Sequence, residues 1–133
     1  MPEDPPSPKR EVMPDYAAAA LSYALGAVTG ALFLILEPYN RNRLVYFHAW
    51  QSIYYSAAGF LLYFLCVAAV MVMPWSVIGI VWFLMFFGTL ALVGMWFWLM
   101  YQAYQGKRWK APLIGPLAQQ RVAQRSFRDN AGY

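Results

Sequence analysis

Few side chains in this 133-residue chain could form a reactive or ligand-binding site, and they share one predicted helix face. His48 is the only histidine, and residues 44–104 contain no Asp, Glu, Lys or Arg. The polar residues near it recur at spacings of three and one, as one face of an α-helix requires. We call this set the polar stripe: His48, Gln51, Ser52, Tyr55 and Ser56.

The polar stripe has three interpretations. Its side chains could hydrogen-bond between helices, since polar groups within a membrane usually pair internally. They could line an aqueous path, which would need several copies of the chain. His48 could be the axial ligand of a haem or pigment, because one imidazole is enough. The expectation is nevertheless no cofactor, and no metal, because Cys66 lies far along the chain and no acidic residue accompanies His48.

The sequence does not contain a set of residues typical of an enzyme. The apolar segments lack paired carboxylates, a Ser/His/Asp set and a glycine-rich phosphate loop. Glu37 lies close to Arg41 and Arg43 and is expected to pair with one of them. We therefore expect a protein that does not catalyse a reaction.

The elements that carry these residues are predicted to be membrane helices. Apolar residues make up 61% of the chain and charged residues 12%, a balance typical of membrane proteins. A bilayer core of ~30 Å takes about 20 helical residues to cross, so residues 44–104 hold two crossings. Pro74 lacks a backbone donor and separates the expected helices 44–73 and 77–104. The first is longer than a crossing needs, so its early turns are expected to form an amphipathic, interfacial entry.

A third crossing is expected over residues 16–36, between Asp15 as N-cap and Glu37 before a proline. Small residues spaced by four let helices approach closely in lipid. They could form a dimer seam or pack against other helices of the same chain. This helix-packing set is Ser22, Gly26 and Gly30. The predicted fold is an all-α integral membrane bundle with three transmembrane helices in residues 16–110.

The two ends of the chain are polar. Residues 1–15 are proline-rich and expected to lack regular structure, and residues 111–133 form a basic tail with a short interfacial helix over 117–128. With three crossings, the distribution of Lys and Arg places the N-terminus outside and the C-terminus in the cytoplasm of the inner (plasma) membrane. Five basic residues are expected to contact anionic lipid headgroups: Arg41, Arg43, Lys107, Arg108 and Lys110. The net charge of +4 lies beside apolar runs, so no nucleic acid partner is expected.

Three pieces of the sequence resemble a known family. They are LSYALGAVTGALFLILEPYNRN, VYFHAWQS and AYQGKRWKAPLIGPLA. Together they resemble the prokaryotic relatives of the chloroplast inner-envelope import component Tic twenty, over about residues 20–120. The plant members are linked to a protein-conducting channel and are usually drawn with four membrane helices. The family-like positions, none with a catalytic role to carry over, are His48, Gln51, Ser52, Gly106, Lys107, Pro112 and Gly115.

The resemblance implies a small, non-enzymatic membrane component that contacts other membrane proteins or copies of itself. Many prokaryotic members of that family are catalogued only as a domain of unknown function. Two alternatives remain open. The chain could be a subunit of an oligomeric channel or protein-translocation pore, or an accessory transmembrane subunit of an energy-converting or photosynthetic complex.

Overall fold

The fold is known from a computed structural model, in which residues 13–132 are described and every regular element is helical. The expected irregular segment 1–15 therefore lies mostly outside the described residues. The elements, in chain order, are α1 (Asp15–Leu21), α2 (Ala27–Ile35), the short 3-10 helix η1 (Tyr39–Arg41), α3 (Arg43–Val72), α4 (Trp75–Tyr104) and α5 (Gly115–Asn130). The all-helical expectation is confirmed for this part of the chain.

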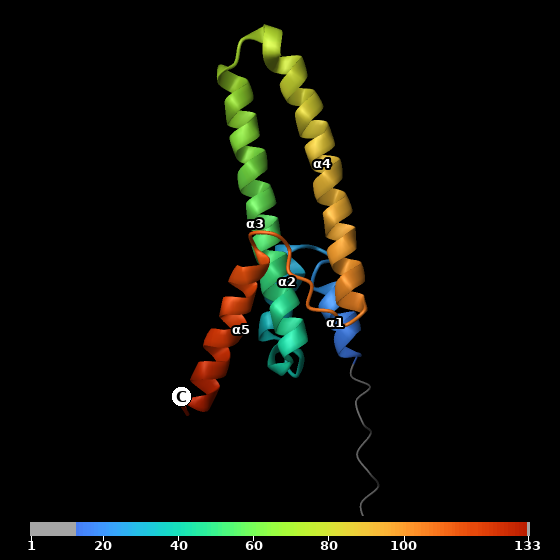
Figure 1. The fold of residues 1–133 in the computed structure, drawn as a ribbon, viewed down its shortest axis with the longest axis vertical. Coiled ribbons are helices and arrows are strands. Elements are labelled where there is room, and N and C mark those ends of the chain that lie inside the picture. Colours follow the sequence, from blue (N-terminus) through green and yellow to red (C-terminus); the bar gives the residue numbers. More distant parts are fainter. Residues whose placement is uncertain (1–12, 133) are drawn as a thin grey trace, which may run out of the picture.

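Helices α3 and α4 form one long hairpin (Figure 1). Each has 30 residues, or ~45 Å at 1.5 Å per residue, and both are long and apolar enough to cross a membrane. Asn42 starts α3, because its side-chain oxygen accepts from the backbone N–H of Leu44 at 2.8 Å. We call the turn at Met73 and Pro74 the tip. The opposite end, where α1, α2 and α5 gather, is the base.

The predicted single helix over residues 16–36 is wrong, because the chain breaks between α1 and α2. Gly26 has a φ of 59°, and α2 then runs back beside α3. Asn42 Nδ2 donates to Asp15 Oδ2 at 2.6 Å, and Met13 N donates to the Tyr39 hydroxyl at 2.9 Å. Both ends of this segment therefore lie at the base. It is a re-entrant hairpin, and the structure has two long apolar helices in place of three crossings.

The predicted placement of the chain ends on opposite sides of the membrane assumed three crossings, whereas the described residues contain two long apolar helices. Residues 13–15 lie beside η1 and the start of α3, and α5 packs against the same end of α3. Both ends of the described chain therefore lie at the base (Figure 1).

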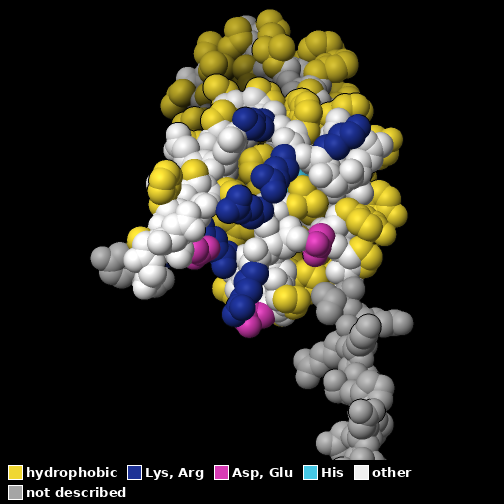
Figure 2. All heavy atoms as spheres, turned by 60° about the horizontal axis from the view of Figure 1, so that its bottom comes forward, with side chains coloured by type: hydrophobic (Ala, Val, Ile, Leu, Met, Phe, Trp, Pro, Cys, Tyr) yellow, Lys and Arg dark blue, Asp and Glu magenta, His cyan; other side chains and the backbone are white. Residues whose placement is uncertain are grey.

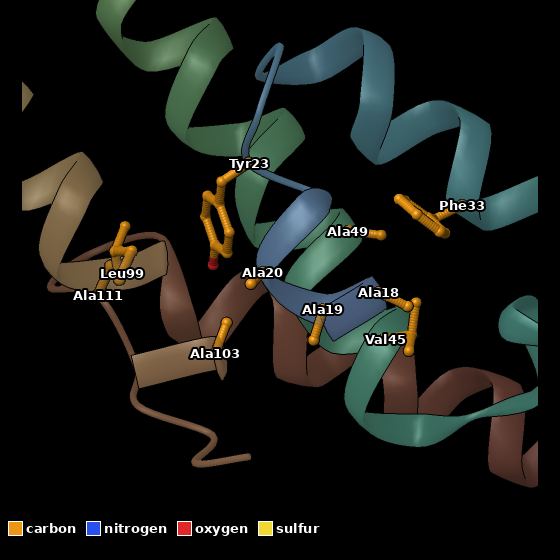
Figure 3. Packing of buried hydrophobic residues seen from close by; sticks show 10 residues of the cluster. All are labelled: Ala18, Ala19, Ala20, Tyr23, Phe33, Val45, Ala49, Leu99, Ala103 and Ala111. Carbon is orange, nitrogen blue, oxygen red and sulfur yellow. The ribbon is translucent and has the colours of Figure 1, made fainter. Parts of the chain in front are cut away.

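The core lies at the base, around the first half of α3. Alanines of α1 let this helix sit close to both α3 and α4, and Ala18 lies beside Val45 (Figure 3). The buried apolar cluster is Ala18, Ala19, Ala20, Tyr23, Phe33, Val45, Ala49, Leu99, Ala103 and Ala111. Towards the tip the hairpin is bare, and Phe60, Met71 and Trp75 are 80–91% exposed. Such a surface suits lipid and would be a large exposed apolar patch in water.

Helix α5 is longer than the predicted 117–128 and is held by arginines. The guanidinium of Arg121 lies 4.8 Å from the centroid of the Trp50 ring, and that of Arg125 lies 4.7 Å from the centroid of Tyr46. Arg121 Nε also donates to the Tyr54 hydroxyl at 2.9 Å. Cation–π contacts of this kind stabilise by ~0.5–1 kcal/mol each when exposed.

Gly26→Ala is expected to lower the stability of the protein by ~1–3 kcal/mol, because φ is positive there and an added Cβ would lie 2.5 Å from Ser56 Oγ. Thermal unfolding in detergent measures the effect. Gly79→Ala is the matched control, since nothing lies within 4 Å of the added Cβ. Equal stability of the two variants would contradict the tight turn at Gly26.

Candidate functional site

The polar stripe of α3 is enclosed by the re-entrant hairpin and by residues 107–111, which follow α4. His48 and Gln51 are fully buried, and Ser52 is 1% exposed. Tyr55 and Ser56, one turn nearer the tip, are half-buried. The structure thus brings the predicted residues together on one helix face, and that face points into the protein.

His48 joins three parts of the chain. Its Nδ1 lies 3.0 Å from the Tyr23 hydroxyl, and its Nε2 lies 3.0 Å from the backbone oxygen of Lys107. A carbonyl oxygen only accepts, so Nε2 carries the proton and Nδ1 accepts from Tyr23. Both ring nitrogens of this neutral imidazole are therefore engaged by protein groups. A haem or pigment could bind only by replacing one of these bonds.

At the turn between α1 and α2, several backbone carbonyl oxygens accept hydrogen bonds from side chains. Ser52 Oγ lies 2.7 Å from Ser22 O and 2.9 Å from Gly26 O. Thr29 Oγ1 donates to the same region, 2.9 Å from Ser22 O, and Trp96 Nε1 donates to Tyr23 O at 2.9 Å. Irregular backbone at membrane depth is tolerated only where the protein satisfies it, and these donors do so.

Gln51 and Tyr55 of the polar stripe also bond within the chain. With its amide oriented to suit both neighbours, Gln51 donates to Trp109 O at 3.3 Å and accepts from Ala111 N at 3.1 Å. The Tyr55 hydroxyl donates to Leu92 O on α4. The polar stripe thus connects α3 to the hairpin, to α4 and to the segment that leads to α5.

The predicted helix-packing set does not form one helix face, because Ser22 and Gly26 lie in or beside the turn. Gly30 alone is within a helix at a close crossing, where an added Cβ would lie 2.8 Å from Ala49 O on α3. Gly30 therefore serves the close α2–α3 contact within the chain, which is one of the two expected uses of these small residues.

The five predicted basic residues all lie at the base, and Figure 2 shows Lys and Arg side chains spread over that face. Arg41 pairs with Glu37 at 3.1 Å, as expected for this acid. Arg43 Nη2 donates to Ser126 Oγ on α5 at 3.2 Å. Lys107, Arg108 and Lys110 are exposed.

Sequence reasoning missed the partners of the polar stripe. Trp96 lies in the expected helix 77–104, and Tyr23 and Thr29 lie in the expected continuous helix 16–36, with no polar role predicted for any of them. The helix break itself would have identified them, because only a turn at Gly26 leaves carbonyls that need side-chain donors. Within residues 13–132, no group of three or more His, Cys, Asp or Glu is placed to hold a metal ion.

Comparisons with known proteins give three archaeal relatives. A UPF0132 membrane protein of Methanocaldococcus jannaschii is 38% identical over 76% of this chain and 82% of its own length. One of Archaeoglobus fulgidus is 34% identical over 83% of this chain and 97% of its own length. A second UPF0132 membrane protein of M. jannaschii is 28% identical over 74% of this chain and 64% of its own length. No family model and no solved structure matches the chain.

A double-mutant cycle tests the bond between His48 and Tyr23. Each of His48→Ala and Tyr23→Phe is expected to lower the unfolding free energy by ~1–3 kcal/mol, because a buried polar group loses its partner. The loss of unfolding free energy in the double variant should be smaller than the sum of the two single losses, by at least ~0.5 kcal/mol, as expected for coupled sites. Unfolding in mixed SDS and mild detergent measures this. Tyr101→Phe, at an exposed tyrosine of α4, should be additive with His48→Ala; additivity in both pairs would contradict the bond.

Proposed function

Because this chain belongs to the UPF0132 family of membrane proteins, we propose that it is a non-enzymatic component that binds a transmembrane helix of another membrane protein. One observation carries the proposal. The two long helices do not close on each other between base and tip, and an apolar groove lies between them.

The groove consists of two adjoining cavities of about 410 and 320 Å³. Gly59 of α3 and Gly88 of α4 line both, and Tyr55, Leu113 and Ile114 close the end towards the base. Leu113 has a φ of 69° and is 90% exposed, although its side chain is apolar. This end of the groove thus presents an apolar side chain on strained backbone, as binding sites often do.

The glycines favour a helix as the occupant over a lipid chain. An added Cβ at Gly59 or Gly88 would meet nothing within 4 Å, so packing inside the chain does not require either glycine. Glycine within a helix costs ~0.5–1 kcal/mol relative to alanine. A lipid chain packs equally well on larger side chains, whereas close approach of a second helix needs small residues.

The polar stripe supports this function over the channel alternative. Its hydrogen bonds run to backbone and side chains of the same chain, so they favour a role in holding the fold together. No observation favours conduction or a pigment-bearing complex. The kinship with the Tic-twenty-like family remains part of the proposal. It rests on the three resembling pieces of the sequence.

The base is proposed to face the cytoplasm of the plasma membrane. Eight Lys and Arg residues of the described chain lie at or near the base, in residues 41–43 and 107–128, and the tip has none. Positively charged segments flanking membrane helices are retained on the cytoplasmic side.

Cysteine labelling in intact cells tests this orientation. In a Cys66→Ser background, Ser76→Cys at the tip is expected to react with a membrane-impermeant maleimide, whereas Ser7→Cys should react only after permeabilisation. The reason is that residues 13–15, which follow Ser7 in the sequence, lie at the basic end of the molecule. Labelling of Ser7→Cys in intact cells would contradict the proposed orientation.

Site-specific photo-crosslinking tests the proposed partner. A photoreactive phenylalanine analogue at Leu62, which lines the groove, is expected to give an adduct with another membrane protein in cells. Leu61 is the matched control, because it is 60% exposed but lies outside both cavities. Gly59→Leu should fill the groove and remove the adduct, while Gly79→Leu should not.

Each other outcome contradicts the proposal. Adducts of equal yield at both positions would show that the groove is not selective. An adduct between two copies of this chain would favour the oligomeric alternative. Absence of any protein adduct, together with native masses equal to one chain plus lipid, would favour lipid as the occupant.

A further inference from the structure

Three basic side chains from distant parts of the sequence converge on a separate hollow at the base. The hollow has a volume of about 240 Å³ and lies between the start of α3, the segment after α4, and α5. We call it the basic pocket. It is lined by Arg43, Phe47, Arg108, Lys110, Gln119, Val122, Ala123 and Ser126. Figure 2 shows the face on which it opens.

No carboxylate lines the basic pocket. The three carboxylates within residues 13–132 have other partners, namely Glu37 with Arg41, Asp129 with Arg125, and Asp15 with Asn42. The positive charges of Arg43, Arg108 and Lys110 are therefore not neutralised by the described part of the chain. Grouping three like charges is unfavourable unless an anion joins them.

The polar groups of the basic pocket are suited to phosphate. Arginine presents a planar fork of N–H donors that matches phosphate oxygens, and lysine adds a compact charge. The Ser126 hydroxyl accepts from Arg43 Nη2 at 3.2 Å, so its own proton is free to be donated, and Gln119 brings an amide NH₂ group. Phe47, 2% exposed, gives the pocket an apolar wall.

We propose that Arg43, Arg108 and Lys110, together with Gln119 and Ser126 of α5, form a binding site for a phosphate group. The site lies at the end of the molecule where the long helices leave the membrane. The phosphate can therefore come from an anionic lipid headgroup or from a soluble phosphate compound. Binding would hold α5 to the segment that follows α4.

Native mass spectrometry in detergent, with phosphatidylglycerol as the probe and phosphatidylcholine for comparison, tests the site. Combined Arg43→Gln, Arg108→Gln and Lys110→Gln substitutions are expected to weaken phosphatidylglycerol binding on the order of 100-fold, because each lost charge weakens binding about fivefold and the three losses multiply. The matched control is Arg41→Gln, Lys107→Gln and Arg128→Gln, which removes the same charge from exposed positions outside the pocket. It should change binding only a few-fold.

A second arm separates the two sources of phosphate. Inorganic phosphate is compared with chloride at equal ionic strength, by thermal unfolding of the wild type and the pocket variant. Stabilisation of the wild type alone, without preference for phosphatidylglycerol, would assign the site to a soluble phosphate compound. Equal losses in both triple variants, or no difference between wild type and pocket variant with either probe, would overturn the proposal. Should the triple variant not fold, Arg108→Gln alone should weaken binding about fivefold.

Discussion

Backbone carbonyls in lipid must find a donor within the protein, and this requirement explains the arrangement of the base. At the α1–α2 turn the Ser22 oxygen accepts from the side chains of Ser52 and Thr29. The oxygens of Gly26 and Tyr23 accept backbone bonds from Gly30 N and Gly26 N, and Ser52 and Trp96 add side-chain donors to them. The polar stripe is thus the counterpart of the turn. Each would be unfavourable in a membrane without the other, and together they fix how α1, α2 and α3 assemble.

This assembly gives the two halves of α3 different surroundings. At the base, α3 is surrounded by α1, α2, α5 and the segment 107–111, and its polar residues form hydrogen bonds within the chain. Beyond Ser56 the same helix continues as a bare apolar rod beside α4, with the groove between them. One helix therefore serves as the centre of a polar-bonded bundle at the base and as a surface for an apolar partner towards the tip.

The sequence predicts the long helices well because their signals are strong. The apolar run and Pro74 leave little freedom, and α3 and α4 begin and end within two residues of the expected positions. The segment 16–36 was misread because its apolar length matches a crossing, and only Gly26 marks the break. The polar stripe was found from its spacing, but its partners depend on the turn. The basic pocket needs three elements brought together, which spacing along the chain does not reveal.

The re-entrant hairpin also gives the molecule an uneven outline across the bilayer. At the base α1, α2, α3 and α4 lie together with α5 against them, whereas at the tip only α3 and α4 remain (Figure 1). Such a wedge displaces more lipid from one leaflet than from the other. Lateral pressure in the membrane then acts unequally on its two ends, so lipids of small headgroup and membranes of matching curvature accommodate it with the least strain.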